Sequence, residues 1–215
     1  MTFRPRQGLH FQEAMMNSES RLALTAGVAL LERAIDYTLG SLRVVTPATL
    51  CRATPCAGWT LEKLLDHVTD SLSTLNEAAA GHIGPFTRRA GRQTEGGNPA
   101  LLLRDNATEV LGTWAGALTS DLIFLHDRHL TTPMVAVVGA IEITVHGWDV
   151  ARSCGENRPI PPLMAEELLD LVPLFVSQAD RPARFAAQVP VPAYAPAQDH
   201  LLAYLGRDPN WQSCT

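Results

Sequence analysis

Glu142 and His146 stand four residues apart in the segment MVAVVGAIEITVHGWDVARS, which is otherwise apolar enough to be a core helix. Side chains at this spacing lie one helical turn apart on the same stripe of a helix. A carboxylate oxygen and an imidazole nitrogen placed in this way can bind one divalent metal ion, as histidine pairs do in zinc hydrolases. The spacing also fits an ordinary ion pair on an exposed face, but the neighbours Val135, Val138 and Gly139 favour an enclosed stripe.

A zinc site needs a third protein ligand from another part of the chain, and the best candidate is His67 in TLEKLLDHVTDSLSTL. His67 lies beside the apolar arc of this predicted helix, on a stripe with Thr60, Ser71 and Thr74. Small hydroxyl side chains around an imidazole suit the wall of a polar pocket better than a solvated face. The alternative is a merely structural histidine.

Two carboxylates are candidates to orient these imidazoles through hydrogen bonds. Asp149 follows His146 by one helical turn, and Asp66 directly precedes His67. Metal-binding histidines commonly donate their second ring N–H to such a group. Both aspartates also fit ordinary surface or capping positions.

Other candidate residues have weaker support. His126 and His129 are expected near the end of a helix as surface or capping residues. A nucleophilic pair of Cys56 or Cys154 with His146 rests on residue type alone. The four cysteines have no paired spacing, which indicates reduced thiols. Nucleotide-binding and serine-hydrolase motifs are missing from the sequence.

Helical periodicity predicts the elements that must position these side chains. The predicted helices cover residues 19–42, 60–80, 101–120, 133–153 and 161–178, with a short last helix in DHLLAYLGR. Thr60 serves as the N-cap of the second helix, and Trp59 packs on Leu64. Residues 81–100 form a long Gly- and Pro-rich crossover, which permits the helices on either side to run parallel. The pattern predicts an all-α four-helix bundle, in which inward side chains form metal and ligand sites.

Length, composition and charge narrow the class of protein. The chain of 215 residues is 46% hydrophobic, so residues 19–215 are expected to form a single domain, preceded by a flexible tail at 1–18. A net charge of -5 without a basic stripe argues against nucleic acid as a partner. The N-terminus lacks a secretory signal, and no apolar run reaches the roughly 20 residues that span a bilayer, so we expect no membrane partner and a cytoplasmic protein.

Three motifs in order resemble the DinB-like, mycothiol-dependent maleylpyruvate isomerase family, especially its short actinobacterial branch: TPCAGWTLEKLLDHV, EITVHGWDVARSCG and APAQDHLLAYLGRDPNW. The similarity runs from about residue 20 to residue 211. It implies a DinB-type four-helix bundle that holds a divalent metal, usually zinc, with two histidines and a glutamate. At the matching motif positions these ligands are His67, Glu142 and His146, the residues that the helical stripes select independently.

The resemblance also shapes the expected function. Isomerases of the family carry an additional C-terminal α/β domain, whereas this chain ends soon after LLAYLGRDPNW, so we expect only a short C-terminal extension and a reaction other than maleylpyruvate isomerisation itself. The leading hypothesis is a metal-dependent chemistry, with zinc as the expected metal, in which a low-molecular-weight thiol such as mycothiol is activated for transfer to, or isomerisation of, an electrophilic small molecule.

Two alternatives stay open at this stage. One is a thiol-independent metal enzyme of secondary metabolism, a hydrolase, a lyase or a rearrangement catalyst, in which Arg88, Arg89 and Arg92 of the crossover bind an acidic substrate. The other is a non-catalytic metal-binding or regulatory protein. A homodimer is compatible with all of these hypotheses.

Overall fold

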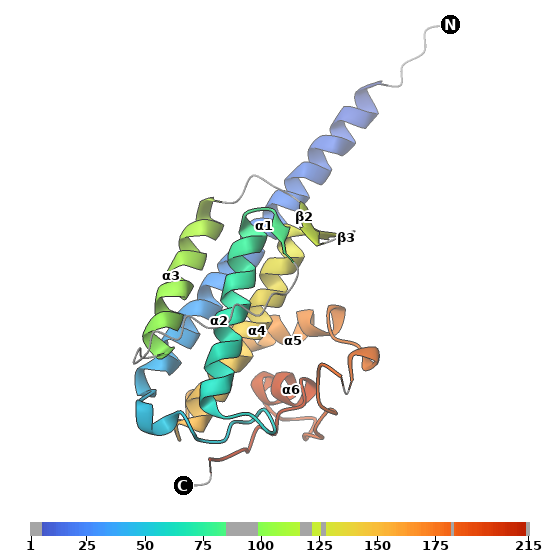
Figure 1. The fold of residues 1–215 in the computed structure, drawn as a ribbon. Helices are drawn as coiled ribbons and strands as arrows, with labels where there is room; N and C mark the ends of the chain where they lie inside the picture. The colour runs from blue at the N-terminus through green and yellow to red at the C-terminus, as the bar shows by residue number, and fades with distance from the viewer. Residues whose placement is uncertain (1–5, 85–98, 117–121, 126–127, 182, 214–215) are drawn as a thin grey trace, which may run out of the picture.

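The structure is a computed structural model, and it describes residues 6–84, 99–116, 122–125, 128–181 and 183–213. Four long helices form a bundle: α1 Arg6–Ser41, α2 Leu61–Ala79, α3 Pro99–Gly116 and α4 Thr132–Ser153. Two short helices, α5 Pro162–Leu171 and α6 Ala197–Tyr204, lie beside the lower half of the bundle in Figure 1. The predicted all-α four-helix bundle is therefore confirmed.

The helices pair as two parallel couples, as Figure 1 shows. In the first couple, α1 and α4, the Thr38 hydroxyl donates to the carbonyl of Ile143 at 2.7 Å. In the second couple, α2 and α3, the indole Nε1 of Trp114 donates to the carbonyl of Leu75 at 3.0 Å. The parallel arrangement of α2 and α3 agrees with the predicted long crossover, although residues 85–98 of that crossover lie outside the described residues.

Gly139 lies where α4 packs closely against α2. A Cβ at this position would lie 2.6 Å from Cδ2 of Leu75, so the leucine side chain would have to shift to make room for it. Helix α2 begins as the sequence predicts, because the Thr60 side chain accepts a hydrogen bond from the backbone N–H of Lys63 at 3.3 Å. Because α2 begins at Leu61 and packs against α4, the predicted ligand of α2 lies beside the predicted ligands of α4.

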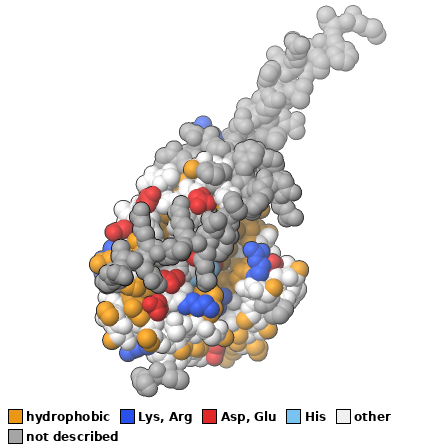
Figure 2. All heavy atoms as spheres, in the orientation of Figure 1, with side chains coloured by type: hydrophobic (Ala, Val, Ile, Leu, Met, Phe, Trp, Pro, Cys, Tyr) orange, Lys and Arg blue, Asp and Glu red, His pale blue; other side chains and the backbone are white. Residues whose placement is uncertain are grey.

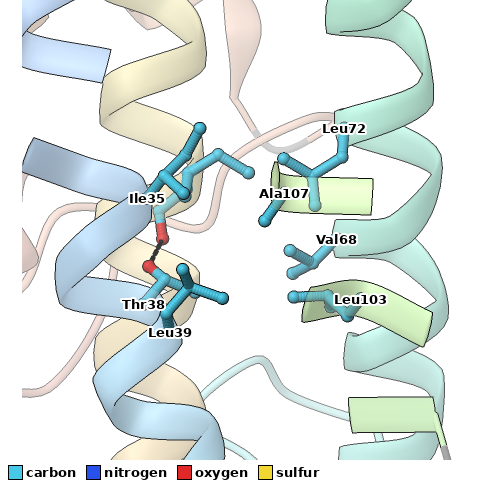
Figure 3. A pocket seen from close by; sticks show the side chains of 8 residues that line it. Ile35, Thr38, Leu39, Val68, Leu72, Leu103 and Ala107 are labelled. Carbon is cyan, nitrogen blue, oxygen red and sulfur yellow. Dashed lines mark hydrogen bonds between the residues drawn. The ribbon is translucent and has the colours of Figure 1, made fainter. Parts of the chain in front are cut away.

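The interior between the helices is apolar. Figure 3 shows the contact region, where Thr38 contributes the single hydroxyl among side chains that are otherwise aliphatic: Ile35, Leu39, Val68, Leu72, Leu103, Ala107 and Ile143. Because the Thr38 hydroxyl is already bonded to Ile143, this region is a packing core with no polar group to offer a ligand. The chemistry must be sought at the edge of the bundle.

Helix α4 is the central helix of this core. By length and composition it could span a membrane, but 72% of its most apolar window is buried inside the bundle, as expected of a core helix. On the face shown in Figure 2, Lys and Arg side chains are interspersed with acidic and apolar ones.

Several boundaries differ from the sequence predictions. Helix α1 begins at Arg6, so residues expected in a flexible tail continue the first helix. Helix α5 ends at Leu171 rather than near 178, whereas the predicted end of the third helix near residue 120 lies outside the described residues. Pro173 ends the fifth helix, because proline cannot donate the backbone hydrogen bond that would continue it.

The structure also contains a small three-stranded sheet that the periodicity of the sequence does not predict. Strands β1 His82–Ile83, β2 Leu122–Leu125 and β3 Arg128–Thr131 pair in the order β1-β2-β3, with β1 parallel and β3 antiparallel to β2. His129 therefore lies in a strand, not near a helix end, and His126 lies outside the described residues. A short apolar run such as LIFL carries no period by which a strand could be told from a helix.

Candidate metal centre

Helices α2 and α4 bring the three predicted ligands together. Nε2 of His67 lies 2.6 Å from Oε1 of Glu142, and Nε2 of His146 lies 3.2 Å from the same oxygen. The two imidazole rings meet edge to face, with centroids 5.0 Å apart. Residues from distant parts of the sequence thus present one oxygen and two nitrogens to a common point.

The donor set suits a divalent metal such as zinc. All three ligand atoms lie within 4.8 Å of one another. Bonds of about 2.0–2.1 Å in a tetrahedral site place neighbouring ligand atoms about 3.3 Å apart, so the observed separations need only small adjustments. Two nitrogens and one carboxylate oxygen from the protein leave a fourth position for a water, a thiol or a substrate.

One side of this centre is accessible to solvent. The side chains of His67 and Glu142 are 38% and 32% exposed, whereas that of His146 is 5% exposed. Figure 2 shows a recess between the long helices and residues 162–213, which carry α5 and α6 and are called the C-terminal segment below; apolar side chains form much of its visible wall. A small molecule can therefore approach the ligands from the α2 side while His146 stays enclosed.

The charges of the ligands are strongly coupled. Burial raises the pKa of Glu142, but the positive charge of His146 and hydrogen bonds from both histidines outweigh it and hold this pKa well below its usual value. Burial lowers the pKa of His146, but Glu142 and the hydrogen bond to Asp149 outweigh it and raise this pKa well above its usual value. The Ser71 hydroxyl donates a further hydrogen bond to Oε1 of Glu142 at 3.3 Å. A metal ion must therefore displace a proton to bind here.

Asp149 lies behind His146, on the side away from the other ligands. Its Oδ2 is 2.9 Å from Nδ1 of His146, and its side chain is fully buried. Because Nδ1–H donates to this carboxylate, loss of the proton on Nε2 would leave a lone pair that faces Glu142 and His67. Asp66 occupies a different setting: it is exposed on α2 and belongs to neither group of close ligand atoms among the described residues.

A second group of close ligand atoms consists of Cys56, His146 and Asp149. The Cys56 thiol donates to Oδ2 of Asp149 at 3.3 Å. However, Nη2 of Arg207 lies 3.4 Å from both the Cys56 sulfur and that oxygen. Because a guanidinium is always charged in proteins, this group already contains its cation and would repel a second one. The His67–Glu142–His146 group is the better metal site of the two.

Two residues beside the site were not recognised from the sequence. Trp59, assigned there only to a helix-start contact, stacks on His146 with centroids 6.4 Å apart and meets His67 edge-on at 5.0 Å. Arg207 follows the last helix, where no periodic pattern marks it, and only the motif LLAYLGRDPNW indicated its segment. Of the alternative cysteines, Cys56 contacts the site, whereas Cys154 is in neither group of close ligand atoms. Arg88, Arg89 and Arg92 lie outside the described residues.

Comparison with known proteins connects this geometry to a family. The profile of the mycothiol maleylpyruvate isomerase N-terminal domain family matches residues 31–151, more than half of the chain, and this span contains all three candidate ligands. The chain belongs to this family. The resemblance found in its sequence motifs is thereby confirmed.

Individual relatives match most of the length of this chain, but their names give little information about function. Two uncharacterized proteins from two strains of Mycobacterium tuberculosis are each 28% identical over 180 residues, covering 82% of this chain and 94% of their own length. A solved structure of a histidine-to-alanine mutant of mycothiol-dependent maleylpyruvate isomerase is 16% identical, with a TM-score of 0.46, and covers 68% of this chain and 67% of that one. The family assignment therefore rests on the profile match rather than on this structure.

Proposed function

We propose that the protein is a cytoplasmic, divalent-metal-dependent enzyme, with zinc as its metal, that activates a low-molecular-weight thiol such as mycothiol. The activated thiol is transferred to, or promotes isomerisation of, an electrophilic small molecule. The observation that carries this proposal is the convergence of His67, Glu142 and His146 on one point with an accessible side. Membership in a family named for a mycothiol-dependent isomerase supports the use of a thiol.

The residues of this chain have distinct parts in that chemistry. His67, Glu142 and His146 would hold the metal, which when bound supplies the Lewis acidity that stabilises a thiolate at neutral pH. Asp149 keeps the imidazole of His146 in the tautomer that presents Nε2 to the other ligands.

The surroundings complete the arrangement. The Ser71 hydroxyl orients Glu142 through its hydrogen bond, and Trp59 stacks on His146 and meets His67 edge to face. Because the pKa of His146 is raised, the proton on its Nε2 would have to be released to solvent for these three residues to hold a metal. The accessible side near His67 then receives the thiol and its electrophilic partner.

Two measurements test the proposal. Metal analysis of the purified protein should find close to one zinc or similar ion per chain, and H67A should lose it. A protein without such an ion after reconstitution would contradict the metal centre. Calorimetric titration of the metal-loaded protein with mycothiol should then give binding, whereas absence of binding would leave a thiol-independent metal enzyme or a non-catalytic metal-binding protein as the better explanation.

A further inference from the structure

The carboxylate of Asp149 collects three hydrogen-bond donors on a single oxygen. Nδ1 of His146 lies 2.9 Å from Oδ2, the Cys56 sulfur 3.3 Å, and Nη2 of Arg207 3.4 Å. The other oxygen, Oδ1, is buried and has no hydrogen-bond partner among the described residues. All the bonds that orient Asp149 therefore run through the oxygen that faces His146.

Arg207 is held rigidly enough to set the position of this oxygen. Its side chain is only 12% exposed, and its Nη1 donates to the carbonyl of Leu205 at 2.8 Å. Gly206, directly before it, has a φ of 79°, a backbone conformation that glycine adopts without strain. A Cβ on Gly206 would also lie 2.8 Å from Cβ of Ala186, so the turn is built for glycine.

The packing of α6 explains how this turn reaches the metal centre. Leu201, Leu202 and Leu205 are fully buried, which anchors the end of α6 against the rest of the protein. The turn at Gly206 then directs the arginine side chain toward α4 and the buried carboxylate. The C-terminal segment thus supplies the permanently charged side chain that contacts Asp149 among the described residues.

A buried carboxylate is costly without a nearby positive charge, and removal of one partner of a buried ion pair is strongly destabilising. If the guanidinium were lost, Asp149 would lower this cost by admitting water or by turning away from its present position. Either change weakens its hydrogen bond to Nδ1 of His146, because the same oxygen serves both partners. The imidazole would then no longer be fixed with Nε2 toward the other ligands.

We propose that Arg207 is a positioning residue of the metal centre, which holds Asp149 against His146 and so makes metal affinity depend on the C-terminal segment. The inference rests on the proposed function, since it takes His67, Glu142 and His146 as the metal ligands. It assigns the C-terminal segment a part in the site that lies beyond the span of the family match, which ends at residue 151.

The test compares two arginines of the C-terminal segment, Arg207 and Arg181, each of which makes a partly buried hydrogen bond. R207M removes the charge beside Asp149, while R181M serves as the control, because Arg181 donates to the backbone carbonyls of Ala186 and Tyr204 and does not contact the metal centre. Zinc dissociation constants are measured by competition with a chromophoric chelator, and unfolding of the metal-free proteins is followed by circular dichroism. R207M should weaken zinc binding by about 10- to 100-fold, as removal of partners behind metal ligands commonly does. R181M should lower the unfolding temperature without changing zinc affinity.

Further variants separate positioning from a general structural effect. R207K keeps a positive charge and should restore part of the lost affinity. D149N should weaken zinc binding to a similar degree, and combining it with R207M should add little, because both changes break one chain of contacts. If R207M is too unstable to purify, R207K against D149N carries the same comparison.

The outcomes distinguish this inference from the proposed function. A wild-type protein that binds no zinc contradicts the metal centre itself. Zinc binding by wild type with unchanged affinity in R207M overturns the positioning role alone. Equal losses of affinity in R181M and R207M also overturn it, since the effect would then be one of general packing.

Discussion

The two ring nitrogens of His146 face two different environments. Nε2 points toward Glu142 and His67, whose side chains are partly exposed and which carry one carboxylate and no permanent cation. Nδ1 points toward the fully buried Asp149, beside which Arg207 supplies a fixed positive charge. Both sides offer atoms of the kind that bind metals, yet only the second already holds a guanidinium that would repel a metal ion. The type of ligand atom is therefore not sufficient to favour a metal site, and the local charge balance distinguishes the two groups.

The largest expected effect comes from removing a ligand on the Nε2 side. H67A should weaken zinc binding by at least about 100-fold, more than the loss of a residue behind a ligand. The stability of the fold should change little, because this side chain is 38% exposed. Chelator competition measures the affinity, and H200A is the matched control, since His200 lies on α6 outside both groups of close ligand atoms. Equal zinc affinity in H67A and wild type would show that His67 is not a metal ligand.

The second-largest effect should be the dependence of zinc affinity on pH. The raised pKa of His146 means that the metal-free protein holds a proton there, so zinc binding should strengthen as the pH rises, by about tenfold per unit while one proton is displaced. The stability that this shift confers on the metal-free protein is fully present below the ordinary histidine pKa and is lost as the pH rises through the raised value. Calorimetry in buffers of different ionisation heat measures the released protons, and a pH-independent affinity would contradict this protonation state.

The zinc affinity of a Cys56 variant distinguishes the two candidate groups of metal ligands. C56S keeps a hydrogen-bond donor for Asp149, so zinc affinity should fall by less than about tenfold. If the metal were held instead by Cys56, His146 and Asp149, the same change would remove a ligand and cost far more. Absorption spectra of the cobalt-loaded protein provide a direct check, because a thiolate-to-cobalt band should be missing until mycothiol is added.

The smallest effect is expected at Asp66. The sequence predicts that this carboxylate helps to orient His67, but its exposure limits the strength of any such interaction to about 1 kcal/mol. D66N should therefore weaken zinc binding by about fivefold at most. D149N, compared in the same chelator assay, should show a much larger loss. A D66N effect equal to that of D149N would mean that both sides of the centre depend equally on carboxylates.

Much of the bundle was predictable because an amphipathic helix requires apolar residues at regular spacing along the local sequence. The period of apolar residues located all four long helices, and the N-cap at Thr60 was placed correctly. The errors fall where local patterns are short or ambiguous. LIFL was too short to show a period, and the start of α1 at Arg6 lies in a stretch where charge and glycine suggested a loose tail.

The sequence by itself determined that Glu142 and His146 share one face of a helix, because a fixed turn of 3.6 residues relates positions four apart. It also indicated His67 through the polar stripe of its helix and the family motifs. Only the tertiary structure decided that His67 meets Glu142 and that Arg207 lies beside Asp149. These contacts join residues 75 and 58 positions apart, so they depend on how the helices pack rather than on any local spacing.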